Sequence, residues 1–306
     1  MNLSPSSESG QDPLSDVLDI LGATVSRTTR LEASGTWALA FPPVDRLKFV
    51  AVLRGQQWMV APGLEPRCLV AGDVCLLGRT AYTVASAVDV PPIDGRSFYE
   101  PASDVARIGG DDTISVGGTV TFAADNAGFL LDRLPTFMWV PHSAPASGSI
   151  ATILALMGIE IGRGAIGSGI IGARLADVLV VEAIRAYLDV EEHPAGWLGA
   201  LVDPRMGPAL RALHADVARP WTVALLASIA CMSRASFAAE FTRRLGQPPL
   251  AYLRSWRLAR AHTSLATGGI TVERVAREVG YRSQSAFSQA YKRTYGVVPT
   301  ARSRTS

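Results

Sequence analysis

The hydrophobic pattern is most regular in the last third of the chain, where it occurs twice. Apolar residues recur at every fourth position over residues 237–245 and again over residues 287–295. This spacing places them on one face of an α-helix and leaves the other face for solvent or a partner. Corresponding residues such as Ser233 and Ser283 are 50 positions apart. Because the pattern returns at a fixed period, the sequence predicts a repeated pair of helices.

Start and stop signals divide each copy into a helix, a tight turn and a second helix. Thr222 and Thr271 suit the N-cap of the first helix, and Ser233 and Ser283 suit that of the second. A hydroxyl at the N-cap accepts a hydrogen bond from a free backbone N–H. Glycine then provides the left-handed residue after the second helix, and proline prevents its continuation. These stop signals are Gly246, Pro249, Gly296 and Pro299.

Residues 24–139 show a different pattern, of short apolar runs separated by Pro, Gly and Asp. Such runs predict a β-sandwich or barrel. We expect strands at residues 36–41, 47–53, 57–61, 67–70, 73–77, 82–85 and 118–123. Residues 90–113 are polar and rich in Gly and Pro, and are predicted to form one long loop. Asp12 and Pro13 begin a short predicted helix that ends near Leu21.

Residues 146–188 return to helical spacing, with Ile150, Ile153 and Met157 on one face. The apolar face is wide, so these helices should be buried on more than one side. On periodicity alone, ordinary core is one interpretation of these helices.

Charge separates the chain into two regions of opposite sign. Residues 219–306 carry 14 Lys and Arg against 3 Asp and Glu, a net charge of +11, whereas residues 1–218 carry 15 against 24, a net charge of −9. The total of +2 therefore conceals a strongly basic region that contains both helix pairs. A basic domain with paired helix-turn-helix units is typical of a protein that binds double-stranded DNA.

The remaining composition narrows the class of protein. A chain of 306 residues with 48% hydrophobic content fits two globular domains. Cys68, Cys75 and Cys231 are odd in number and form no CxxC pair, which favours reduced thiols. We see no pattern of a signal peptide, and no apolar run of the roughly 18 residues that a membrane span needs. We therefore expect a cytoplasmic protein without membrane contacts.

A specific set of residues covers the whole basic region. It comprises Trp221, Ser233-Arg234, Phe237, Phe241, Gly246, Pro249, Tyr252-Leu253, Trp256-Arg257, Val275-Ala276, Gly280-Tyr281, Ser283, Phe287, Tyr291-Lys292, Gly296 and Pro299. With this set, residues 203–302 resemble the DNA-binding domain of the AraC/XylS family of bacterial transcription regulators. The resemblance implies two helix-turn-helix units joined by a long helix, each with one helix in the major groove. It also implies that residues 146–188 form a dimerisation helix or a packing surface between the domains, with ordinary core as the alternative. A homodimer, a contact with RNA polymerase and, for a basic DNA-binding domain of a bacterial family, association with the nucleoid are expected as well.

The first part carries a shorter set: Asp12-Pro13-Leu14, Trp37, Phe41-Pro42, Val52-Leu53-Arg54-Gly55 and Ala71-Gly72-Asp73-Val74. It resembles the cupin-like sensor domain that precedes some AraC-type DNA-binding domains. Cupin enzymes hold a metal ion with a cluster of His and a Glu, but the first histidine here is His142. A metal site in the barrel is therefore disfavoured. Trp37, Phe41, Trp58 and Tyr82 are candidates for an effector pocket, although alternating core residues would give the same pattern.

The resemblance assigns outward positions to each recognition helix. Ala235, Ala238 and Ala239 in the first offer only methyl contacts to thymine, whereas the second is rich in groups that pair with base edges. The predicted base contacts of the second unit are Arg282, Gln284, Ser285, Ser288 and Gln289. The predicted phosphate contacts are Ser233, Arg234, Arg243, Arg244, Arg257, Ser283 and Lys292. For each polar residue a solvated helix face is the alternative, and for Arg257 an internal salt bridge.

The sequence thus predicts an α+β chain: a cupin-like β-barrel with following helices, and then an all-α domain with two helix-turn-helix motifs. The expected boundaries are a disordered segment at 1–12, a sensor domain at 13–142, a helical dimerisation and linker region at 143–198, and a DNA-binding domain at 199–306. The expected function is transcription regulation in response to an unknown small-molecule effector, without enzymatic activity, cofactor or metal. The alternatives are a cupin metalloenzyme with a DNA tether and an architectural DNA binder without a ligand.

Overall fold

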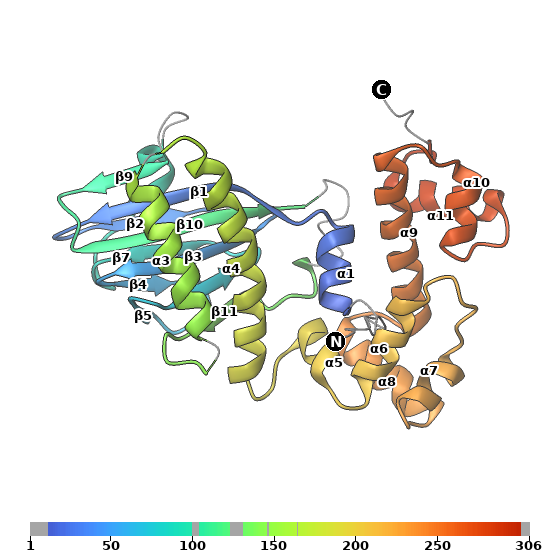
Figure 1. Ribbon diagram of the computed structural model, residues 1–306. Helices are drawn as coiled ribbons and strands as arrows, with labels where there is room; N and C mark the ends of the chain where they lie inside the picture. The colour runs from blue at the N-terminus through green and yellow to red at the C-terminus, as the bar shows by residue number, and fades with distance from the viewer. Residues whose placement is uncertain (1–11, 100–103, 123–130, 146, 164, 301–306) are drawn as a thin grey trace, which may run out of the picture. The chain divides into compact units, whose positions relative to one another are not determined.

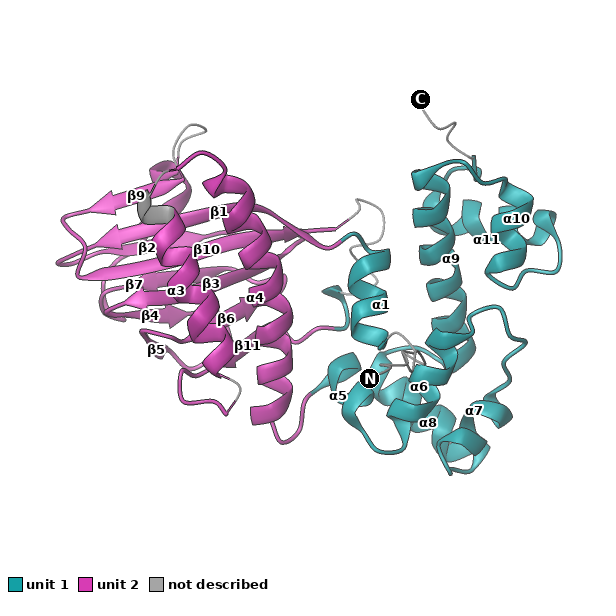
Figure 2. Cartoon of the chain, in the orientation of Figure 1, with its two compact units in different colours: residues 1–22, 123–133, 195–306 teal, residues 23–122, 134–194 magenta. Residues whose placement is uncertain are grey.

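The computed structural model describes residues 12–99, 104–122, 131–145, 147–163 and 165–300 (Figure 1). The chain forms two compact units. Unit 1 contains residues 1–22, 123–133 and 195–306, and unit 2 contains residues 23–122 and 134–194 (Figure 2). The segment expected to be disordered lies outside the described residues except for Asp12.

Two β-sheets form the body of unit 2. The larger sheet has the strand order β11-β6-β3-β10-β1-β9 and the smaller the order β5-β4-β7-β2-β8. The larger sheet comprises β1 (Thr24–Ala33), β3 (Leu47–Arg54), β6 (Val74–Leu77), β9 (Val105–Ile108), β10 (Thr113–Thr121) and β11 (Phe137–Val140). The smaller comprises β2 (Ala38–Phe41), β4 (Gln56–Val60), β5 (Arg67–Val70), β7 (Tyr82–Ala85) and β8 (Ile93–Asp94). Only the pairs β1–β9 and β2–β8 are parallel among these ladders.

Side chains from both sheets pack into one apolar core. Leu31 and Val50 of the larger sheet lie in the same buried cluster as Leu39, Met59 and Val84 of the smaller. Because side chains alternate along a strand, every second residue of these short runs points inward. The predicted cupin-like, sheet-rich domain followed by helices is confirmed.

Two parts of the strand prediction differ from the structure. The predicted strands correspond to β2–β7 and β10, but β1 and β11 are not among them. The residues of β1 show no clear alternation of burial. The prediction of one long loop at 90–113 is wrong. This stretch contains β8, a 3₁₀ helix η1 (Gly95–Phe98) and β9, which pairs with the distant β1. A pairing between residues so far apart in sequence cannot be predicted from the local pattern of hydrophobic and polar residues.

Two helices cover part of the larger sheet. Helices α3 (Ser147–Arg163) and α4 (Ser168–Val190) contact each other, and α4 also contacts β1, β6 and β11. The carboxylate of Asp177 accepts a hydrogen bond of 2.6 Å from the backbone N–H of Val25, which ties α4 to β1. One face of the pair is buried, but Leu156, Ile170 and Val178 are 46%, 73% and 50% exposed. The wide apolar surface is thus only partly covered within the chain.

Unit 1 is helical and is organised around the long helix α9 (Pro249–Thr267). Near one end of α9 lie α7 (Val223–Ile229) and α8 (Arg234–Leu245), and near the other lie α10 (Val272–Glu278) and α11 (Gln284–Tyr295) (Figure 1). Helices α5 (Gly196–Val202) and α6 (Met206–Ala215) precede them. No single described helix has the length and apolar composition of a membrane span, although the bent pair α7 and α8 together meets both criteria.

The N-terminal helix α1 (Pro13–Ile20) packs in unit 1, against α6 and α9, although the sequence places it at the start of the sensor domain. Its predicted cap is confirmed, since Asp12 accepts a hydrogen bond from the backbone N–H of Ser15. The hydroxyl of Thr263 in α9 donates to the carbonyl oxygen of Ile20 at 2.5 Å. The apolar face of α1 is therefore buried by the helical unit.

Candidate nucleic-acid interface

The two helix-turn-helix units share one turn geometry despite different residues. The left-handed turn residue is Cys231 in the first unit, with φ of 52°, and Gly280 in the second, with φ of 83°. In both units the next residue, Met232 or Tyr281, donates its N–H to the carbonyl five residues earlier, at 2.9 and 2.8 Å. The one-residue insertion of the second unit is therefore Arg282. Helices α7 and α8 meet at 88°, which suits a helix-turn-helix.

The caps predicted for both recognition helices are confirmed. Ser233 and Ser283 each accept a hydrogen bond from the backbone N–H three residues on, at 3.1 and 3.2 Å. Gly246 and Gly296 end the helices in the left-handed conformation, with φ of 72° and 74°. Both serine hydroxyls thus hold helix ends, and a phosphate contact would add to that role.

Aromatic side chains fix each recognition helix to α9. In the first unit Phe241 lies edge-on to Tyr252, with ring centroids 5.6 Å apart. In the second, Phe287 and Tyr291 are buried, and the hydroxyl of Tyr291 lies 2.7 Å from Nδ1 of His262. Since the inner faces are packed in this way, the outer faces of α8 and α11 are held in a defined orientation.

A chain of buried polar groups connects α1, α5, α6 and α9. The indole N–H of Trp197 donates to the hydroxyl of Tyr252 at 2.9 Å, and that hydroxyl lies 2.8 Å from Nε2 of His214. On its other side, Nδ1 of His214 is 3.6 Å from the carboxylate of Asp16, which is too long for a hydrogen bond, so the carboxylate attracts the ring only when the imidazole is protonated. Burial lowers the pKa of His214, and Asp16 partly opposes that shift.

Arg257 donates inward rather than toward a ligand. Its guanidinium donates to the carbonyl oxygens of Val217, Ala218 and Arg219, at 2.8, 3.3 and 2.9 Å. These carbonyls follow the end of α6, and burial lowers the pKa of Arg257. The sequence left open an internal salt bridge, whereas the internal partners found are backbone carbonyl oxygens.

Arg244 is also used inside the domain. Its guanidinium lies 2.9 Å from Asp203 and 2.5 Å from Glu240, and its side chain is only 23% exposed. Arg243 forms a 2.6 Å ion pair with the same Glu240 but is 66% exposed. The hydrogen bonds from Arg243 and then Arg244 hold the pKa of Glu240 at about 2. Arg244 therefore fastens α8 to the loop before α6, while Arg243 stays accessible.

The predicted base-contacting residues lie on one outer surface of each recognition helix. In the second unit Arg282, Gln284, Ser285 and Gln289 are exposed and Ser288 is half-buried. In the first unit Ala235 and Ala239 are exposed and Ala238 is half-buried. Arg234, Arg282 and Lys292 are exposed and have no ion-pair partner among the residues that the structure describes. The second unit thus presents polar side chains where the first presents methyl groups.

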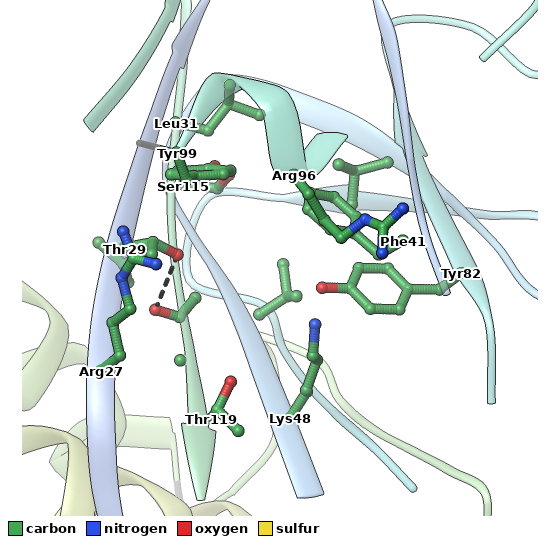
Figure 3. A pocket seen from close by; sticks show the side chains of 15 residues that line it. Arg27, Thr29, Leu31, Phe41, Lys48, Tyr82, Arg96, Tyr99, Ser115 and Thr119 are labelled. Carbon is green, nitrogen blue, oxygen red and sulfur yellow. Dashed lines mark hydrogen bonds between the residues drawn. The ribbon is translucent and has the colours of Figure 1, made fainter. Parts of the chain in front are cut away.

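A separate cavity of about 350 Å³ lies within unit 2, between its two sheets (Figure 3). Phe41 and Tyr82, both predicted for an effector pocket, line it and stack with ring centroids 5.0 Å apart. Trp37 belongs to the buried core and, like Trp58, is not among the lining residues. Lys48 also lines the cavity but was not among the predicted pocket residues. The signal that could have identified it is a lysine within an apolar strand.

The described residues contain no group of three or more His, Cys, Asp or Glu side chains placed to hold a metal ion. What the structure does define is a basic domain with two capped helix-turn-helix units on one rigid helix, next in sequence to a sheet-rich domain with a cavity. This combination is the architecture of a DNA-binding regulator with a sensor domain.

Comparison with known proteins agrees with that class. A family model described as Cupin matches residues 12–189, and one described as a helix-turn-helix domain matches residues 226–304. A relative from Streptomyces lividans named as an AraC-like transcription regulator is 39% identical over 293 residues, covering 94% of this chain and 96% of the relative. The regulator AlkR of Acinetobacter baylyi is 29% identical over 300 residues, covering 94% of this chain and 97% of AlkR.

Among solved structures, ToxT from Vibrio cholerae aligns over 89% of this chain and 94% of its own, at 12% identity and a TM-score of 0.35. That score is too low to transfer geometry to this chain. The sequence relatives decide the assignment: the chain belongs to the AraC-like family of DNA-binding transcription regulators, with a cupin-type N-terminal domain.

Proposed function

We propose that this regulator reads DNA sequence mainly through α11, while α8 positions the protein. The observation that carries the proposal is the contrast between the two outer surfaces. Gln284 and Gln289 can pair bidentately with adenine and Arg282 with guanine, whereas alanines can only contact the methyl group of thymine. Because α9 joins both units, the two helices enter successive major-groove segments about one helical turn apart.

The phosphate contacts in this proposal come from the accessible groups only. Arg234 and Lys292 are exposed cations in a region with an excess of basic residues, and Arg243 is accessible beside Glu240. The hydroxyls of Ser233 and Ser283 lie at helix N-termini, where backbone N–H groups favour an anion. Arg244 and Arg257 are left out, since their guanidinium groups are held by carboxylates and carbonyls of the domain itself.

We also propose that the protein acts as a homodimer. The support is the apolar surface of α3 and α4, where Leu156, Ile159, Ile170 and Val178 are 46%, 47%, 73% and 50% exposed. A second copy of the chain would remove these side chains from water. An effector bound in unit 2 would then bias the dimer or the DNA-binding unit, and bound regulator would contact RNA polymerase. The proposal includes no catalytic activity and no cofactor.

The base contacts are tested by replacing both glutamines, Gln284→Ala with Gln289→Ala, in DNA fragments selected by the unaltered protein. Each lost bidentate contact should reduce discrimination by about 1–3 kcal/mol. Affinity for the selected site should therefore fall at least roughly thirtyfold, while affinity for random DNA stays unchanged. Thr294→Ala, an exposed change near the end of the same helix, is the matched control. Equal losses on both DNAs would refute the assignment of these residues to sequence readout.

A further inference from the structure

The cavity of unit 2 combines an aromatic wall with positive charge. Its lining includes the rings of Phe41, Tyr82 and Tyr99 and the cationic side chains of Arg27, Lys48 and Arg96, but no Asp or Glu (Figure 3). Its volume of about 350 Å³ lies in the range of small-molecule pockets. The charged side chains of the lining are therefore all positive, and much of the rest of the lining is apolar.

The three cations are not equivalent. Arg27 is paired with Asp104, and Arg96 with Asp94, each at 2.7 Å. Lys48 has no carboxylate partner among the described residues, and its ammonium group lies over two rings instead, 5.3 Å from the centroids of Phe41 and Tyr82. Two of the positive charges are thus balanced by the protein, and the third is not.

Lys48 bears this charge at a cost. It stands in β3 between buried residues, and burial, followed by the charge of Arg46, lowers the pKa of its ammonium group. A half-buried charge without a counter-charge loses hydration that the two rings only partly replace. An anion in the cavity would replace the hydration that the Lys48 ammonium group loses on burial. If that anion carried an aromatic ring or a flat chain, this part would extend the stack of Phe41 and Tyr82, whose planes are 20° apart.

Gly117 keeps this space open. It stands opposite Thr29 on one side and Val50 on the other, and all three residues line the cavity. A Cβ at Gly117 would lie 3.2 Å from the backbone carbonyl oxygen of Phe49, 3.6 Å from Oγ1 of Thr29 and 4.0 Å from Cγ2 of Val50. A larger side chain at this position would therefore occupy the volume that a ligand needs.

We propose that the cavity binds a small organic anion with a flat apolar body, its single negative charge paired with Lys48 and its body stacked on Phe41 and Tyr82. The inference rests on the proposed role of unit 2 as the sensor, and it specifies the chemical class of the effector. A neutral ligand of the same shape would leave the charge of Lys48 without a counter-charge, so charge is the main determinant of selection.

The test measures binding of 2-naphthoate and of its neutral counterpart 2-naphthamide to the full-length protein by isothermal titration calorimetry. We expect the carboxylate to bind roughly tenfold or more tightly than the amide, because the carboxylate brings a negative charge to the ammonium group of Lys48, whereas the amide offers it only a neutral acceptor. Lys48→Met keeps the apolar stem and should remove that difference. Arg54→Met, at the exposed end of the same strand and outside the cavity lining, should preserve it.

A second variant, Gly117→Val, should abolish binding of both compounds by filling the cavity, while DNA binding and the melting temperature show that the protein is folded. No binding of 2-naphthoate, equal binding of acid and amide, or a preference that survives Lys48→Met would each overturn the inference. DNA binding measured in the same preparations distinguishes a failure of the proposed ligand class from a failure of the proposed function. If DNA is bound specifically but the anion is not, only the ligand class fails, whereas loss of specific DNA binding in the unaltered protein would remove the proposed function itself.

Discussion

Replacing Arg257 by methionine separates an internal brace from a DNA contact. Methionine keeps much of the length and apolar volume of the side chain but removes its charge and its donors. The three carbonyl oxygens of residues 217–219 then lose donors at 2.8, 3.3 and 2.9 Å. Arg257 also contacts the second unit, since a Cβ at Gly280 would lie 2.7 Å from one of its terminal nitrogens. The change should therefore loosen the junction between both units.

The size of the effect follows from these contacts. A hydrogen bond from a charged donor contributes about 1.5–3 kcal/mol, but the three bonds share one guanidinium and two of them are exposed to water. We therefore expect a total loss of about 2–3 kcal/mol rather than the sum. For a helical unit of this size, that loss lowers the melting temperature by roughly 6–15 °C.

Two assays on one preparation test the reasoning. Thermal unfolding should show the lowered melting temperature, while the dependence of DNA affinity on salt concentration, measured at 25 °C, should keep its slope. Arg234→Met is the matched comparison, because the loss of one phosphate contact lowers that slope by about one unit with little change in stability. If Arg257→Met instead flattened the salt dependence and left the melting temperature unchanged, Arg257 would be a phosphate contact and the internal assignment would be wrong.

Two further predictions concern stability. Cys231→Gly should stabilise the protein by about 0.5–1 kcal/mol in a denaturant titration. The left-handed conformation costs a residue other than glycine about 1–2 kcal/mol, and the greater chain entropy of glycine in the unfolded state offsets part of the gain. Gly280→Ala should destabilise the protein, and an unchanged midpoint for Cys231→Gly would contradict the turn geometry. Burial lowers the pKa of His214 in the folded state, so the unfolded chain binds the proton more tightly. Stability from this group should be complete above about pH 6.5 and should fall as the pH drops below that value. Unfolding measured from pH 7 to 5 should show this loss of stability, and the loss should be smaller in His214→Gln. An identical pH dependence in the variant would show that another group is responsible.

The features that the sequence predicts well are those that depend on neighbours in the chain. The N-caps at Ser233 and Ser283 and the left-handed Gly246 and Gly296 are set by residues within one helical turn, and each is found where expected. The apolar face of each helix follows from spacing alone. The same local signals place α1 correctly, even though they cannot show what it packs against.

The features that the sequence does not reveal depend on distant partners. Strand β9 exists because it pairs with β1, and Arg257 points inward because carbonyls some 40 residues earlier accept its hydrogen bonds. Whether an arginine on a recognition helix is accessible or paired also depends on geometry, as the ion pairs of Arg244 show. Lys48 was visible as a charge in an apolar run, but only the fold places it over two aromatic rings.

The most direct test is selection of genomic DNA fragments by the full-length protein, followed by sequencing of the bound fraction. The account predicts a motif of two short blocks about one helical turn apart, in which the block read by α11 is the more sharply defined. A homodimer would give paired copies of this motif. If nothing were enriched above a background that disappears with added salt, the protein would bind DNA without reading its sequence, and the proposed function would be contradicted.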